Sequence, residues 1–108
     1  MTVKELIAKE NLTPLALLDP EREITGAYAG DLLSWVMGRA QSGDAWVTIM
    51  TNINTVAVAS LADVACVILA EDSEIEPEVV AVAESKEINL LRSSATTYQL
   101  CAALSKLI

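Results

Sequence analysis

The sequence predicts a three-layer α/β fold in which helices cover both faces of a mostly parallel sheet of about four or five strands. From residue 45 onward, apolar segments of strand length alternate with segments of helical periodicity. Such alternation is typical of a parallel sheet with right-handed crossovers, and the short connections agree with it. Hydrophobic residues make up 53% of the 108 residues, which fits one domain with buried strands or with surface covered by another subunit.

The first elements are a helix and a short strand. Thr2 and Glu5 have the spacing of a capping box, so a helix is predicted over residues 3–10. The apolar segment 13–18 is predicted to be a strand. The turn that follows contains Pro20, a residue that favours turns.

A second extended segment, 24–30, is rich in glycine and alanine, which suggests close backbone contact or a bulge. Asp31 is a candidate N-cap for a helix that runs to about residue 40. The polar segment 41–44 is predicted to be a loop. The β-branched residues in 45–50 predict a buried strand.

The strand over 45–50 begins the first of three strand–helix pairs that complete the chain. Asn54 or Thr51 is expected to cap a helix over about 55–62, which leads to a buried strand over 64–70. The remaining elements are an acidic loop, a helix that begins at Pro77 and ends near residue 86, a strand over 88–93 and a last helix over 96–107.

Charge and composition exclude several function classes. Seven Lys and Arg against 15 Asp and Glu give a net charge of −8, which repels nucleic-acid backbones, so no nucleic-acid binding is predicted. No apolar run is long enough for a membrane span, and the charged N-terminus lacks a signal-peptide core. The chain is therefore predicted to be cytoplasmic, with no membrane association.

Candidate catalytic and metal-binding groups are few. The chain has no histidine, which removes Ser-His-Asp triads, Cys-His pairs and His-based zinc sites. Cys66 and Cys101 lie in apolar segments without CxxC spacing and are predicted to be buried free thiols. Glycine-rich phosphate motifs do not occur. The acidic loop after residue 70 could hold a magnesium ion, but acidic residues near a helix start are ordinary, so no metal, cofactor or catalytic residue is predicted.

A ligand site is expected where the strands end. In an open α/β sheet, ligands bind beyond the carboxyl ends of the strands, next to helix N-termini that favour anions. The polar loops there also fit plain helix capping, which is the competing interpretation. The predicted ligand-binding residues are Thr51, Asn52, Asn54, Ser93, Thr96, Thr97, Asp31 and Ser34.

Trp35 and Trp46 are the two tryptophans, and core packing is their simplest role. Trp35 lies close to Met37 in a predicted helix, so an exposed apolar patch for self-association or a partner is an alternative.

Several sequence segments are typical of a known protein family. They are "DLLSWVMGRAQSGDAWVTI", "NTVAVASLAD" and the "TTY" before the last helix. With them, nearly the whole chain resembles the DRTGG-domain family, and especially its small stand-alone members, which are similar to the N-terminal domain of HPr kinases. The two loops that give the family its letters differ here. Thr51 and Asn52 stand where Asp-Arg falls, and Ala70, Glu71 and Asp72 stand where Thr-Gly-Gly falls.

The resemblance implies a non-catalytic regulatory or accessory domain that forms a homodimer and senses a small ligand, such as a nucleotide or another phosphate compound. Loss of the arginine removes a planar group suited to phosphate, and Glu-Asp in place of Gly-Gly adds negative charge. The alternative is an assembly subunit that binds a partner redox enzyme or sensor kinase and has no ligand of its own.

Overall fold

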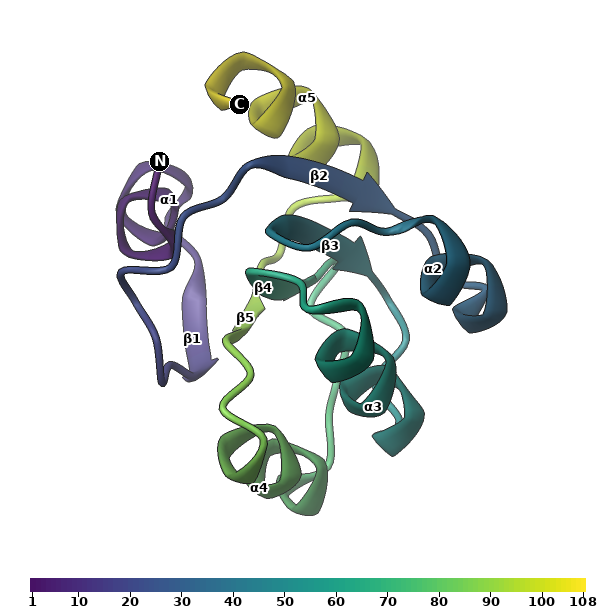
Figure 1. The fold of residues 1–108 in the computed structure, drawn as a ribbon. Helices are drawn as coiled ribbons and strands as arrows, with labels where there is room; N and C mark the ends of the chain where they lie inside the picture. The colour runs from purple at the N-terminus through teal and green to yellow at the C-terminus, as the bar shows by residue number, and fades with distance from the viewer.

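Ten helices and strands follow one another in the order predicted from the sequence. The computed structural model describes residues 1–108 (Figure 1). The elements are α1 (Val3–Glu10), β1 (Thr13–Ala16), β2 (Gly26–Ala29), α2 (Leu33–Arg39), β3 (Asp44–Thr48), α3 (Ile53–Ala62), β4 (Cys66–Leu69), α4 (Pro77–Ser85), β5 (Leu90–Arg92) and α5 (Thr97–Leu107).

The five strands form one sheet in the order β1-β5-β4-β3-β2. β2, β3, β4 and β5 are parallel neighbours, whereas β1 pairs with β5 in the antiparallel sense. The predicted α/β fold with a mostly parallel sheet is therefore confirmed. Strands β1 and β2 are consecutive in the sequence but lie at opposite edges of the sheet (Figure 1).

Helices cover both faces of the sheet. Each parallel strand pairs with the next along the chain, so the crossover helices α2, α3 and α4 lie on one face. Side chains of these three helices pack with Trp46, Val67 and Leu90 of the strands. On the other face, α1 and α5 pack against Val47, Ile68 and other strand residues that alternate with the first set (Figure 1).

The central strands carry the core. Every residue of β3 and β4 is buried, because helices cover both of their faces. Trp46 in β3 is the largest fully buried side chain, and its indole Nε1 donates a hydrogen bond to the Gly30 carbonyl at 2.9 Å.

Several predicted boundaries and caps were wrong. The strand expected over 13–18 ends at Ala16, because the next backbone amides, those of Leu18 and Asp19, bond the Asn89 side chain instead of a strand. The cap of α3 is neither Asn54 nor Thr51. It is Asn52, whose Oδ1 accepts hydrogen bonds from the amides of residues 54 and 55.

Asp31 does not cap α2. The N-cap position is Leu32, which makes no side-chain capping bond. The Asp31 carboxylate instead accepts hydrogen bonds from Thr48 Oγ1 at 2.8 Å and from the Ile49 amide at 2.9 Å. Because β2 and β3 are parallel neighbours, the residues that follow β2 lie beside the end of β3, where Thr48 and Ile49 stand.

The two cysteines differ in exposure. Both are free thiols, as predicted. Cys66 is buried in β4, and burial raises the pKa of its thiol to about 12. Cys101 is only half-buried, which corrects the prediction of full burial, because it lies near an open edge of the sheet. None of the helices combines the length and the apolar character that crossing a membrane requires.

The turn after β4 has an unusual backbone. Glu71 and Asp72 both have positive φ, 59° and 52°, a region that favours glycine. Their amides donate hydrogen bonds to the carbonyls of Ala95 and Ser93, both at 2.9 Å, which ties this turn to the loop after β5. The resemblance stated above implies that other members carry Gly-Gly at these positions.

Glu71→Gly is therefore expected to raise the free energy of unfolding by about 0.5 kcal/mol. Relief of the left-handed conformation, about 1–2 kcal/mol, outweighs the extra entropy of glycine in the unfolded chain, about 0.5–1 kcal/mol. Urea denaturation measures the change. The control is Glu74→Gly in the same loop, where φ is not positive and the substitution should destabilise. Equal effects of the two changes would contradict this account.

Candidate functional site

The carboxyl ends of the four parallel strands meet at one edge of the sheet, which we call the rim. Backbone hydrogen bonds connect them in series: the Gly30 amide donates to Val47, the Ala70 amide to Thr48, and the Ser93 amide to Leu69. The loops that follow β2, β3, β4 and β5 are thereby neighbours, as the sequence analysis expected.

The predicted site residues fall into two groups along the rim. Asp31, Ser34, Thr51, Asn52 and Asn54 lie where β2 and β3 lead into α2 and α3, and the bond from Ile49 to Asp31 joins their loops. Ser93, Thr96 and Thr97 lie where β5 leads into α5. Because α3 and α5 cover opposite faces of the sheet, the two groups flank the end of β4 from different sides.

Part of this polar set is occupied by local structure. Asn52 caps α3, Ser93 Oγ accepts from the Ala95 amide, and Thr96 forms a capping box with Gln99 on α5. Capping was the competing interpretation, and it holds for Asn52 and Thr96, whereas Ser93 stabilises a turn in the loop before α5. The other neutral residues of the set have side chains that form no hydrogen bond within the protein. They are Ser34, Thr51, Asn54 and Thr97.

The electrostatic character of the rim is acidic. Asp31, Glu71 and Asp72 are exposed there, with Arg92 half-buried at the end of β5. The N-termini of α3, α4 and α5 contribute partial positive charge that only partly balances these carboxylates. Neither of the two cavities of the structure is lined by any predicted site residue.

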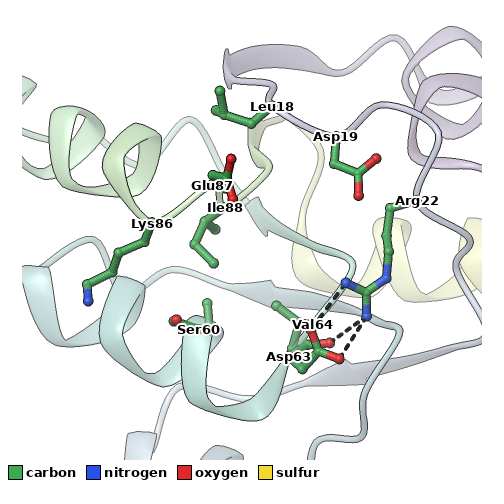
Figure 2. Close-up of a pocket in the computed structure, with 10 residues that line it drawn as sticks. Leu18, Asp19, Arg22, Ser60, Asp63, Val64, Lys86, Glu87 and Ile88 are labelled. Carbon is green, nitrogen blue, oxygen red and sulfur yellow. Dashed lines mark hydrogen bonds and ion pairs between the residues drawn. The ribbon is translucent and has the colours of Figure 1, made fainter.

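A polar cavity of about 390 Å³ lies at the opposite end of the sheet, between the β1–β2 connection and the C-terminal ends of α3 and α4 (Figure 2). Its charged lining residues are Asp19, Arg22, Asp63, Lys86 and Glu87. Three carboxylates outnumber two cations, and helix C-termini add partial negative charge, so the cavity does not favour an anion. No group of three or more His, Cys, Asp or Glu side chains is placed to hold a metal ion.

Arg22 closes one side of this cavity. Its Nη1 and Nη2 each donate to the Asp63 carboxylate at 3.2 Å, and Nη2 also donates to the Asp63 carbonyl at 2.9 Å (Figure 2). Hydrogen bonds from the Ser42 hydroxyl and from Arg22 lower the pKa of the Asp63 carboxyl below its ordinary value. The hydrogen bonds among Arg22, Ser42 and Asp63 attach the long β1–β2 connection to the C-terminal end of α3.

This lowered pKa predicts a pH effect. A carboxylate whose folded-state pKa is depressed stabilises the fold above its unfolded pKa, and the gain is lost as the pH falls through the folded-state pKa. Asp63→Asn is expected to lower the free energy of unfolding by less than about 1 kcal/mol at pH 7, because the side chain is 61% exposed. Urea denaturation below about pH 4 should show the difference shrinking.

The control for this prediction is Asp72→Asn. Asp72 also has a positive φ, 52° against 57° for Asp63, but its side chain makes no hydrogen bond within the protein. If the difference in the free energy of unfolding between the wild type and Asp63→Asn stayed constant with pH, the Arg22–Asp63 pair would contribute through shape rather than charge.

Comparison with known proteins identifies the family to which this fold belongs. The family profile described as "DRTGG domain" matches residues 30–107, from the end of β2 to the end of α5. The chain belongs to the DRTGG-domain family. The resemblance inferred from the sequence segments is thus confirmed.

A solved structure shares the fold of this DRTGG domain. It is described as the crystal structure of the CBS and DRTGG domains of the regulatory region of Clostridium perfringens pyrophosphatase, complexed with its activator diadenosine tetraphosphate. The TM-score is 0.69 at 9% sequence identity, over 95% of this chain and 45% of that one. The chain thus spans less than half of that structure. No curated protein sequence matches the chain.

Two polar groups with structural roles in this DRTGG domain, Asn89 and the Arg22–Asp63 pair, were not predicted from the sequence. Asn89 is 3% exposed and makes four hydrogen bonds with the backbone of residues 18, 19 and 65. Its signal was a lone amide in the apolar segment before β5. Arg22 and Asp63 form the second case, and their separation of 41 residues leaves no local pattern.

Proposed function

We propose that this DRTGG domain is a non-catalytic regulatory domain that senses a small ligand at the rim. The observation that carries the proposal is the family match, together with a fold shared over 95% of the chain with a regulatory region. The activator of that region is a dinucleotide, which supports a nucleotide-like ligand here.

The chemistry of the side chains agrees with a regulatory role. Cys66, the most buried nucleophile, stays protonated because burial raises the pKa of its thiol to about 12. The unbonded polar groups of the rim are neutral hydroxyls and amides, which bind and orient but do not transfer protons at neutral pH.

The rim favours some ligands over others. Thr51, Asn54 and Thr97 offer neutral donors and acceptors suited to the hydroxyl and base-edge groups of a nucleoside. The exposed carboxylates of Asp31, Glu71 and Asp72 repel groups with several negative charges. The ligand class proposed is therefore a nucleoside, or a nucleotide with few phosphate groups, rather than inorganic phosphate.

A thermal-shift experiment tests this proposal with adenosine, AMP, ATP, diadenosine tetraphosphate and inorganic phosphate. A ligand at a hundredfold excess over its Kd adds about 2.7 kcal/mol of stability, which raises the Tm by about 10 °C for a domain of this size. Adenosine or AMP is expected to give the largest shift. The double variant Thr51→Val, Asn54→Ala is expected to lose it.

Ser60→Ala is the matched control, because Ser60 lines the polar cavity at the other end of the sheet. The proposal fails if none of the compounds raises the Tm or if the rim variant keeps the full shift. A shift that only Ser60→Ala removes would place the ligand in the polar cavity and overturn the rim site.

A second candidate function rests on exposed apolar side chains around α2. The exposed fractions of Leu32, Trp35 and Met37 are 58%, 53% and 41%. The Arg39 guanidinium stacks on the Trp35 ring at 3.7 Å from its centroid, which leaves the other ring face open. An exposed aromatic beside arginine is typical of binding hot spots, which supports docking of a partner enzyme or sensor kinase.

Co-purification from the native host tests this second function. Wild-type protein is expected to bring down one partner in stoichiometric amount, and Trp35→Ala to lose it. Leu61→Ala, which truncates another exposed side chain on α3, serves as the control. Absence of a stoichiometric partner, or equal recovery with both variants, contradicts docking through α2.

A further inference from the structure

The two edges of the sheet differ in how they resist further pairing. An exposed edge strand invites another strand, and proteins block such edges with proline, charge or bulges. β1 carries Pro14 and a register shift between Pro14 and Ala16. β2, at the other edge, has the sequence Gly-Ala-Tyr-Ala and a regular register, so none of these devices protects it.

The backbone groups that β2 turns outward belong to Ala27 and Ala29. Ala29 is in register with Val47, and the Gly30 amide donates to the Val47 carbonyl at 3.1 Å. In a parallel ladder, the bonds of Val47 therefore go to the neighbours of Ala29, and the amide and carbonyl of Ala29 point away from β3. The same alternation applies to Ala27. Neither residue takes part in a backbone hydrogen bond outside the ladder, so both amides and both carbonyls are available to a further strand.

An apolar groove of about 490 Å³ runs beside this open edge, between β2 and α5. Its lining includes the exposed Ala27 and Ala29 on one side and Cys101, Leu104 and Ile108 on the other. None of the lining residues is charged. A strand paired with β2 turns every second side chain to the α5 side of the sheet, where the groove can receive apolar groups.

The charges around the groove are mainly negative. Glu23 and Asp31 precede and follow β2; Asp31 is exposed, and Glu23 is 64% exposed although it pairs with the Met1 amino group. Lys106 is the one basic residue of α5 and does not line the groove. The whole chain carries −8. This field attracts a basic partner and repels an acidic one, including a second copy of this chain.

We propose that the β2 edge binds a basic, extended peptide segment of a partner protein, which adds a strand to the five-stranded sheet. The outward amides and carbonyls of Ala27 and Ala29 bond the backbone of the segment. Its apolar side chains, at every second position, enter the groove, and lysines or arginines on both sides of them face Glu23 and Asp31. The surface is separate from the rim and from α2, so it does not depend on the function proposed above.

Fluorescence anisotropy with the labelled peptide Lys-Lys-Val-Thr-Val-Thr-Val-Lys-Lys tests the proposal. It is expected to bind saturably, with one peptide per chain. Two further peptides carry backbone N-methyl groups, one at its valines and one at its threonines. Because only alternate amides of an added strand face β2, one of these two peptides should lose about tenfold or more in affinity. A peptide with glutamates in place of the lysines should bind about tenfold more weakly, because the acidic chain repels it.

Two variants of the chain change the edge itself. Ala29→Pro removes one outward amide but no bond to β3, and edge strands tolerate such a proline. Ala27→Lys places a positive charge in the groove. Each is expected to raise the peptide Kd by about tenfold. Ala8→Lys, on the exposed side of α1, makes the same change of charge elsewhere and should bind as the wild type does. Circular dichroism checks that the variants are folded.

Amide hydrogen exchange measured by NMR tests the edge without any variant. The amides of Ala27 and Ala29 should exchange rapidly in the free protein and slowly in the peptide complex, since they then donate hydrogen bonds. Peptide binding without this protection, or equal binding of all the N-methylated peptides, would mean attraction by charge alone and would overturn the proposal. Failure of the lysine peptide to bind would also overturn it. So would protection that rises with protein concentration in the absence of peptide, because a second copy would then occupy the edge.

Discussion

Trp46→Ala is expected to lower the free energy of unfolding by about 3–5 kcal/mol, a large part of the roughly 5–15 kcal/mol that stabilises a domain. Trp46 is fully buried in the central strand β3, among side chains of the face covered by α2, α3 and α4. Its truncation leaves a cavity that the surrounding helices can fill only in part. The Gly30 carbonyl also loses the hydrogen bond from the indole.

Urea denaturation followed by circular dichroism measures this change. Trp35→Ala is the matched control, because Trp35 is 53% exposed and its loss is expected to change stability by less than about 1 kcal/mol. Trp46→Phe keeps most of the volume but not the indole donor, and it isolates the bond to Gly30. If the two Trp→Ala variants were equally stable, Trp46 would not be the centre of the core.

Asn89→Ala is expected to lower the free energy of unfolding by about 3 kcal/mol, since an unsatisfied buried polar group costs about 1–3 kcal/mol. The side-chain carbonyl of Asn89 accepts from the Leu18 and Asp19 amides at 3.1 and 2.9 Å, and its amide donates to the Asp19 and Ala65 carbonyls at 2.8 and 3.0 Å. Alanine removes every one of these bonds. The β1–β2 connection then loses its attachment to the sheet.

The control for Asn89 is Asn54→Ala at the rim. The Asn54 side chain is exposed and bonds nothing within the protein, so its truncation should change stability by less than about 0.5 kcal/mol. Thermal or urea denaturation distinguishes the two variants. A small loss for Asn89→Ala would mean that water replaces the side chain, and the buried network would then be unimportant for the fold.

Features fixed by neighbouring residues were predictable from the sequence. Thr2 and Thr96 cap α1 and α5 through contacts three residues away, and Pro77 begins α4 as expected. The choice of cap for α3 was not predictable. Three polar candidates lie within four residues, and only the end of β3 at Thr48 decides that Asn52 takes the position.

Features that depend on distant partners were not predictable. Residues 13–16 carry no local information that their partner is β5 or that the pairing is antiparallel. Asp31 has the sequence context of a cap, but its carboxylate bonds the end of β3, because parallel pairing places Thr48 beside it. The meeting of the strand ends at one rim could be predicted from the alternation of strands and helices. The face of the sheet that α5 covers could not, because α5 does not connect two strands of this sheet.

The pairing of β1 with β5 also affects when the chain can finish folding during translation. Residue Thr13 meets Arg92, so β1 has no partner in the sheet until β5 has left the ribosome. Closure over such a separation raises the contact order and slows folding. During that interval the nascent chain depends on other means, such as chaperones or the proline in β1, to keep its first strand from pairing with other polypeptides.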